Sequence, residues 1–240
     1  MKYTMRYLSL LAVLGGSMLW GQGSISGQVK MVGSGPPLRA IKMDADPVCS
    51  AAHTKPVYPE TVTVAEDGSL ANVIISITAG LEGQTFATPT AVVVLDQSGC
   101  QYLPHVWGVM AGQTLEIRNS DATMHNIHSQ SKVNRAFNIA MPKVIKKKNQ
   151  VFKKAEAPFK IKCDVHPWMV TWGAVFDHPF FAVTDAAGGY SLENVPAGTY
   201  TVQAWHESSK RLPAQTQTVT VTDGAAAGLD FTFTPVRRRK

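Results

Sequence analysis

Residues 162–169, KCDVHPWM, bring a thiol, an imidazole and a thioether close together in the chain. Cys163, His166 and Met169 follow the spacing C-x2-H-x2-M. These three side-chain types together suit copper, which favours thiolate, imidazole and thioether ligands. Cysteine and methionine are also common core residues, so Cys163 could instead be a buried thiol at the end of a strand. A trigonal site of one cysteine and two histidines would need a second histidine from elsewhere in the chain.

The segment RNSDATMHNIH offers two candidates for that histidine, His125 and His128. It follows a strand expected over residues 114–119 (TLEIRN), and a polar turn lies between the strand and the histidines. A rigid strand would fix such a histidine at one end of a β-sandwich. In an extended segment the two side chains point in different directions. The residues alone leave the choice between them open.

The composition indicates an all-β fold that positions these residues. Glycine and proline number 19 and 14, and valine and threonine are frequent, which favours short strands and turns over long helices. Buried strands are expected at residues 72–78 and 90–95, and further strands at 101–119, around 150–163 and at 169–177. Residues 24–70 should contain short strands separated by turns. Residues 180–207, and two segments after them, predict a second, smaller β-sandwich.

NSDATMHNIH followed by CDVHPWM resembles the copper site of the cupredoxins, the small blue copper proteins. The resemblance covers residues 71–178 and implies a Greek-key β-sandwich. It implies that His125, Cys163, His166 and Met169 bind one type 1 copper, and it makes His128 a non-ligand. The chain is about twice the length of a minimal cupredoxin, so more than one domain is expected.

The same resemblance assigns roles around the copper. Asn126 would tie the loop of the first histidine to the cysteine loop, and Pro167 would stiffen the loop beside His166. Asp164 departs from the family's pattern, and an acid beside the thiolate is expected to alter the redox potential. His166 is expected on an exposed loop where electrons enter and leave, with Pro167 and Trp168 in an apolar docking patch.

Residues 182–207 (AVTDAAGGYSLENVPAGTYTVQAWHE) resemble the carboxypeptidase regulatory-like, transthyretin-type β-sandwich. This second domain is expected over residues 179–236. Residues 24–38 (SISGQVKMVGSGPPL) resemble the first strand of the same module. We therefore hypothesise that the copper domain is inserted between two parts of one sandwich. The alternative is that residues 24–70 form a β extension of the copper domain.

The N-terminus has the pattern of a secretory signal peptide over residues 1–23. Lys2 and Arg6 precede an apolar run from Leu8 to Trp20, and small residues follow. The run is short for a membrane span, and no second apolar stretch is long enough. The sequence thus predicts a periplasmic or secreted protein without a transmembrane segment after cleavage.

Export permits disulfides, and the chain has 3 cysteines. One of them must remain outside an intramolecular pair. One hypothesis pairs Cys49 with Cys100 and leaves Cys163 for a metal. The alternatives are an intermolecular bridge or an inert buried thiol, and the sequence does not decide among them.

The formal net charge is +6, and the positive charge is clustered. Residues 146–154 read KKKNQVFKK, and a basic tail, RRRK, covers residues 237–240. Such clusters form solvated surfaces, or they attract an acidic partner. No RNA-binding motif interleaves aromatic with basic residues, so no nucleic-acid partner is expected.

Electron transfer to an unidentified redox protein is the expected function. One alternative is a periplasmic copper-binding or trafficking protein with the same ligands, and another is a structural or docking module with a non-redox metal site. We do not expect an enzyme. The chain has no H-x-H pair of the kind that builds further copper centres, and the segment CDVHPWM has a single cysteine, where a dinuclear copper centre needs two.

Overall fold

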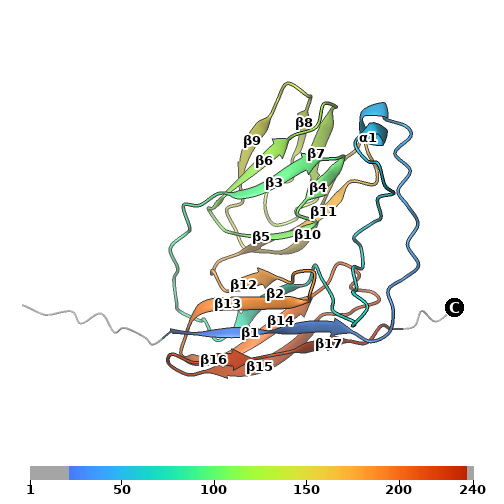
Figure 1. Cartoon of the computed structure of the whole chain (residues 1–240). Helices are drawn as coiled ribbons and strands as arrows, with labels where there is room; N and C mark the ends of the chain where they lie inside the picture. Colours follow the sequence, from blue (N-terminus) through green and yellow to red (C-terminus); the bar gives the residue numbers. More distant parts are fainter. Residues whose placement is uncertain (1–21, 237–240) are drawn as a thin grey trace, which may run out of the picture.

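The computed structural model describes residues 22–236. The expected signal peptide falls outside these residues except at positions 22 and 23, and the basic tail at 237–240 falls wholly outside them. Within the described range the chain is nearly all β-structure, which confirms the predicted fold class (Figure 1). The elements are β1 (Gln22–Met31), α1 (Pro47–Ala51), β2 (Ile74–Ala79), β3 (Val93–Ser98), β4 (Gln101–Leu103), β5 (Val106–Met110), β6 (Thr114–Asn119), β7 (His125–Ser129), β8 (Asn138–Met141), β9 (Lys147–Val151), β10 (Glu156–Lys162), β11 (Val170–Phe176), β12 (Phe181–Val183), β13 (Gly189–Pro196), β14 (Gly198–Trp205), β15 (Gln215–Val221), β16 (Ala226–Gly228) and β17 (Phe231–Phe233).

The upper sandwich in Figure 1 packs two sheets, with strand orders β5-β11-β10-β7-β8 and β4-β3-β6-β9. Alternating residues fill the space between them. On β10, for example, Phe159 and Ile161 point inward while their neighbours are less buried. Trp107, Ile117 and Ile127 from other strands complete the same core. This packing fixes the strand ends from which the candidate ligands project.

The lower sandwich contains strands from both ends of the described chain. One of its sheets has the order β13-β1-β16, with β17 also paired to β1, and the other has the order β12-β2-β14-β15. β1 is antiparallel to β13 and parallel to β16 and β17. Ile25, Val29 and Met31 of β1 are buried in the lower core. The pairing partners of β1 thus lie in the last third of the chain.

The strand at residues 72–78 was expected in the copper-binding domain, and this assignment was wrong. The segment forms β2, which pairs with β12 and β14 of the lower sandwich. The apolar pattern of NVIISIT correctly indicates a buried strand. A run of buried residues does not say which strands lie beside it, because neighbours in a sheet can come from any part of the chain.

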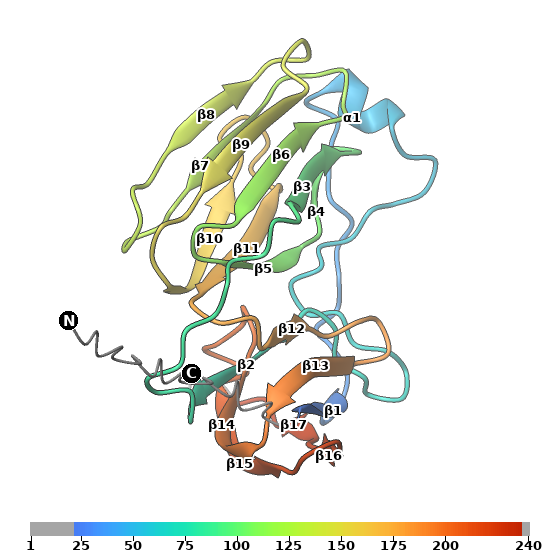
Figure 2. The ribbon, with the colours of Figure 1, turned by 90° about the vertical axis from the view of Figure 1, so that its left-hand side faces the viewer.

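Between β1 and β2 the chain runs up to the upper sandwich and back, as Figure 2 shows. We call residues 32–73 the strap. Short strands were expected here, but the strap forms none. It makes two isolated β-bridges, one between Ser69 and Lys30 of β1 and one between its own residues Val64 and Leu70. Met43 and Cys49 of the strap are buried in the upper core. The strap therefore places α1 at one end of the upper sandwich.

Candidate metal centre

The candidate ligands come from the start of β7 and from the loop between β10 and β11, at the end of the upper sandwich where α1 lies. His125 is the first residue of β7, where it pairs with Met141 of β8. Cys163 follows β10, and Met169 precedes β11. The turn between them is closed by backbone hydrogen bonds, from the Cys163 amide to the Met169 carbonyl at 3.1 Å and from the Met169 amide to the His166 carbonyl at 2.9 Å. Hairpin pairing of β10 with β11 holds both ends of this turn.

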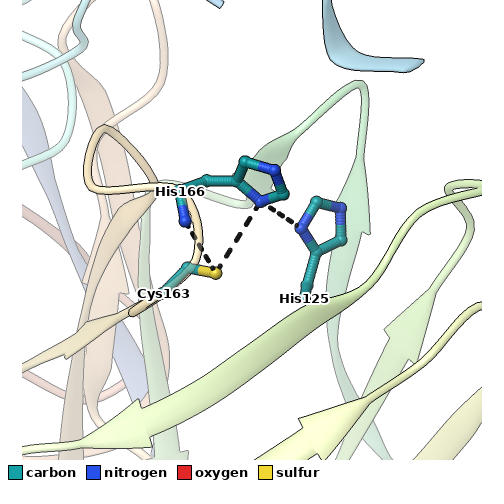
Figure 3. Close-up of side chains that lie close together, drawn as sticks. All are labelled: His125, Cys163 and His166. Carbon is teal, nitrogen blue, oxygen red and sulfur yellow. Dashed lines mark hydrogen bonds between the residues drawn. The ribbon is translucent and has the colours of Figure 1, made fainter. Parts of the chain in front are cut away.

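Three of the predicted ligands meet in a buried group (Figure 3). The donor atoms of His125, Cys163 and His166 all lie within 4.8 Å of one another. Nδ1 of His125 lies 2.9 Å from Nδ1 of His166, and the Cys163 sulfur lies 3.9 Å from Nδ1 of His166. The three residues are at most 2% exposed. Water is therefore largely excluded from the point on which these atoms converge.

The structure distinguishes the two histidines that the sequence left open. His125 faces Cys163 and His166, whereas Nδ1 of His128 lies 2.8 Å from the Asp164 carboxylate at the surface. The alternation of β7 separates their directions. Met169 is 1% exposed and packs in the same core as Cys163. Its contacts to the ligand loop described above run through its backbone.

The outer nitrogens of both histidines contact carboxylates. Nε2 of His125 lies 2.8 Å from Asp121, and Nε2 of His166 lies 3.0 Å from Asp46. A carboxylate only accepts hydrogen bonds, so each Nε2 carries a proton and each Nδ1 is directed into the group. A carboxylate behind a ligating histidine is a recurrent feature of metal sites.

Charges within the group favour the metal-binding form of the cysteine. Burial lowers the pKa of His125, but hydrogen bonds and attraction from Asp121 and Cys163 outweigh burial and raise this pKa to about 9. Burial raises the pKa of the Cys163 thiol, yet His125 and the backbone amides around the sulfur lower it overall. The thiolate is the form that binds metals. The group is thus prepared for a cation that would replace the proton on His125.

Asn126 joins the two ligand loops. Its Oδ1 accepts from the Asp164 amide at 2.7 Å and lies 3.2 Å from the Cys163 sulfur. Its Nδ2 donates to Asn138 at 2.6 Å and to Asp164 at 3.2 Å. Tyr102 donates to the carbonyl of Asn126 from the opposite sheet. Asn126 therefore joins the start of β7 to the cysteine loop through hydrogen bonds.

The Asp164 carboxylate faces the surface and is surrounded by donors. It accepts from Lys162 and Asn138, both at 2.8 Å, and contacts His128. Lys162 first, and then Asn138 and His128, hold the pKa of Asp164 far below its ordinary value. The neighbouring lysine partly offsets the negative charge that follows Cys163 in the sequence.

The loop that bears His166 is exposed at Asp164, Val165 and Pro167, but the His166 side chain is not exposed. The residue is only 2% exposed, because Asp46 and Cys49 of the strap cover its outer edge. Pro167 is exposed and Trp168 is half-buried. The Trp168 ring lies 5.0 Å from that of His166, and its Nε1 donates to the Cys100 carbonyl at 3.0 Å. A segment distant in sequence covers the loop, and local pattern could not reveal this contact.

Cys49 and Cys100 form a disulfide, with their Cα atoms 5.5 Å apart, and Cys163 is a free buried thiol. Asp46 and Asp121 were not predicted as site residues. A local signal for Asp121 existed, because it lies four residues before His125 in the polar segment NSDATMH. Asp46 had no such signal, because it lies in a proline-rich segment that is far along the sequence from both His125 and His166.

The remaining histidines have other partners. His53 Nε2 lies 2.7 Å from the Gly99 carbonyl, and His105 contacts Glu207. His178 Nε2 lies 2.9 Å from the Ile77 carbonyl, and His206 is buried in the lower sandwich. Among the described residues, every group of three or more histidine, cysteine or acidic side chains placed to hold a metal includes His125 or His166.

The donors present fit copper. One cysteine sulfur and two imidazole nitrogens converge in a buried cluster, and a thioether-bearing residue is buried at the end of the same loop. This mixture of soft and borderline ligands is the one that copper prefers.

Among the helices of residues 22–236, none has the length and apolar character needed to cross a membrane.

Solved structures similar to this chain include copper proteins. They include a copper-containing nitrite reductase from Thermus scotoductus SA-01, at 18% identity, with a TM-score of 0.34 over 43% of this chain and 25% of that chain. A purple cupredoxin from Nitrosopumilus maritimus has 23% identity and a TM-score of 0.30, over 35% of this chain and 99% of that chain. A mutant of amicyanin in its Cu(I) form has 24% identity and a TM-score of 0.32, over 35% of this chain and 82% of that chain.

A comparison with curated protein sequences found no match. The chain spans about a quarter of the nitrite reductase, and the chemistry of the candidate site rests on its own side chains. In the lower sandwich, residues 177–234 match the family model of the Carboxypeptidase regulatory-like domain, which takes in β12 to β17.

Proposed function

We propose that this chain is an exported type 1 copper protein that carries single electrons, with one copper held by His125, Cys163, His166 and Met169. The convergence of the first three donor atoms within 4.8 Å of one another in a buried cluster carries the proposal. When bound, copper would supply reversible one-electron exchange. The chain would keep the ligands in place, through Asn126 between the loops and through carboxylates behind the two histidines.

An electron carrier is favoured over an enzyme because the potential metal ligands belong to one centre. The groups found among residues 22–236 share His125 or His166. A copper enzyme of the multicopper type would need further clusters of histidines. The Cys49–Cys100 disulfide supports export, because disulfides persist in oxidising compartments.

We further propose that the copper sandwich is inserted into the carboxypeptidase regulatory-like sandwich. The support is that β1, from the N-terminal side of the insertion, hydrogen-bonds to β13 along six residue pairs.

We also propose a redox partner with an acidic surface. The support is that Lys146, Lys147 and Lys148 are exposed together at the start of β9. Attraction between opposite charges would speed such an encounter.

The proposal is tested by adding Cu(II) to the purified, metal-free protein and recording visible and electron paramagnetic resonance spectra. A type 1 site gives an intense thiolate-to-copper band and narrow hyperfine splitting. Cys163→Ser should abolish the band. His125→Ala should abolish it as well, whereas His128→Ala, a matched control in the same strand, should keep it. A colourless wild-type protein, or a band that survives Cys163→Ser, would reject the proposal.

The covered position of His166 favours one alternative, copper storage or trafficking, because a buried centre exchanges electrons slowly with protein partners. The two functions differ in a measurable rate. Fast, reversible oxidation and reduction on an electrode or with a second electron carrier supports electron transfer. Transfer of copper to a chelator or apoprotein, faster than any electron exchange, supports trafficking.

A further inference from the structure

The outer edge of His166 is covered by a short structured segment, residues 46–49. Asp46 caps the N-terminus of α1, where its Oδ1 accepts from the Val48 amide at 2.8 Å. Its Oδ2 accepts from the Thr123 hydroxyl at 2.8 Å and lies 3.0 Å from Nε2 of His166. We call residues 46–49 the cap. One carboxylate thus orders the cap and contacts the histidine at the same time.

The disulfide fastens the cap to the sandwich. Cys49 is 0% exposed, and its sulfur lies 3.6 Å from Nε2 of His166. Its partner Cys100 lies in the turn between β3 and β4, and the amide of Cys100 donates to Asp121 at 2.8 Å. Asp121 in turn contacts Nε2 of His125. The disulfide therefore connects the cap, which contacts His166, to the β3–β4 turn, which hydrogen-bonds to the Asp121 carboxylate behind His125.

We infer that Asp46 is a positioning residue of the metal centre, and that the Cys49–Cys100 disulfide keeps it in place. This inference rests on the proposed function and concerns the same site. The Asp46 carboxylate accepts the Nε2 proton of His166, which fixes the ring and leaves Nδ1 free to bind the metal. The cap also closes the face of His166 that a redox partner could otherwise approach.

The charge state of Asp46 agrees with this role. Burial raises the pKa of Asp46, but hydrogen bonds from Thr123, the Val48 amide and His166 outweigh it and lower the pKa to about 2. The side chain is therefore a carboxylate at neutral pH. Loss of a comparable carboxylate behind a metal-bound histidine typically costs 10–100-fold in metal affinity.

The test compares Asp46→Ala and Asp46→Asn with Asp44→Asn, all in the full mature protein. Asp44 is an exposed carboxylate of the same strap, so its variant removes the same charge without touching His166. Affinities for Cu(II) and for Zn(II), the copper spectrum, and the reduction potential are measured. We expect Asp46→Ala to lose about 10–100-fold in affinity for both metals, with altered hyperfine splitting and potential, and Asp44→Asn to match the wild type.

Thr123→Val separates positioning from folding. It keeps the Asp46 charge but removes the hydroxyl that holds the carboxylate, so a smaller change in the same direction is expected. Thermal unfolding of the metal-free variants reports whether they are folded. If folded Asp46→Ala matches Asp44→Asn in affinity, spectrum and potential, the inference is rejected while the copper function stands. A wild-type protein that gives no copper band rejects the proposed function itself.

The disulfide is tested by the double variant Cys49→Ser with Cys100→Ser, whose Zn(II) affinity is compared with that of the wild type. The double variant should bind Zn(II) more weakly than the wild type, as Asp46→Ala does. In the copper form, the double variant should also be reduced faster by a small soluble reagent, because the His166 edge becomes accessible. Unchanged affinity and unchanged reduction rate would show that the disulfide does not hold the cap.

Discussion

At the scale of single residues, polar groups around the candidate metal centre hold the side chains of the proposed ligands in place. A buried thiol ordinarily stays protonated, yet His125 and nearby amides lower the pKa of Cys163. Asp121 and Asp46 each direct one imidazole. These contacts are present without a metal, so binding of a metal at the proposed site would not have to order the ligand side chains. Preorganisation of this kind lowers the entropic cost of binding.

Asn126→Ala should weaken metal binding without unfolding the protein. The change removes the acceptor for the Asp164 amide and frees the cysteine loop from β7. We expect a loss of about 10–100-fold in Zn(II) affinity, the range found for groups that orient ligands. Competition with a chromophoric chelator measures it. Asn149→Ala, on the exposed face of β9, is the matched control, and an equal effect of both changes would contradict this role.

At the scale of elements, strand ends position the centre and buried polar contacts hold the connections. The link from β7 to β8 is fastened to β10 by Glu156. This carboxylate is 8% exposed, and it accepts from the Ser131 hydroxyl at 2.6 Å and from the Val133 amide at 3.0 Å. The contact keeps β7 and β10 in register beyond their short ladder, which has only two residue pairs.

Glu156 should make the protein sensitive to acid. Burial raises its pKa, but hydrogen bonds from Ser131, Val133, Asn134 and Lys132 outweigh burial and lower it from 4.5 to about 2. The folded protein thus binds this proton less readily than the unfolded chain. The stabilisation is complete above about pH 4.5 and is lost as the pH falls toward 2.

Glu156→Gln should therefore reduce the free energy of unfolding at pH 7 by about 1–3 kcal/mol and flatten its fall between pH 4.5 and 2. Urea unfolding at a series of pH values measures both effects. Glu66→Gln, an exposed glutamate of the strap, should leave the profile unchanged. A Glu156→Gln profile parallel to that of the wild type would show that this carboxylate is not the group responsible.

At the scale of the whole molecule, the two sandwiches pack against each other. Ile74, Val106 and Ala174 form a small buried cluster between them. The rings of Trp172 and Trp205 lie 5.4 Å apart at the same junction. Alongside the rings, Glu207 of the lower sandwich accepts from Trp172 Nε1 at 2.8 Å and contacts His105 of the upper one.

Glu207→Ala should uncouple the unfolding of the two sandwiches. It leaves the indole N–H of Trp172 without its acceptor and removes one of the two carboxylates near His105, at a junction where the glutamate side chain is 8% exposed. A buried group without its partner costs about 1–3 kcal/mol. Calorimetry should show two separated transitions, or a broader one, in the variant. Glu193→Ala, on the exposed face of β13, is the control, and one unchanged sharp transition in Glu207→Ala would contradict the expectation.

The local sequence determined the strands and the chemistry of the ligands. Alternating and apolar runs indicated β6, β11 and the strands of the C-terminal sandwich, because the inward and outward faces of a strand repeat every two residues. The segment CDVHPWM carried three donor types within one turn, so their proximity follows from chain connectivity alone. The sequence could not decide whether His125 or His128 is the candidate ligand, because this depends on which way each side chain points from β7.

Tertiary structure alone decided what surrounds the centre and which strands pair. The residues of β2 would fit either sandwich, and β2 pairs in the lower one. Asp46 contacts His166 although the two residues are 120 positions apart in the sequence. The local sequence pattern indicates which residues are buried and where turns form. The packing of the whole chain determines which strands pair and which segment covers a site. For this reason the sequence predicted an exposed loop around His166, and only the fold shows that a disulfide-linked segment buries the histidine side chain.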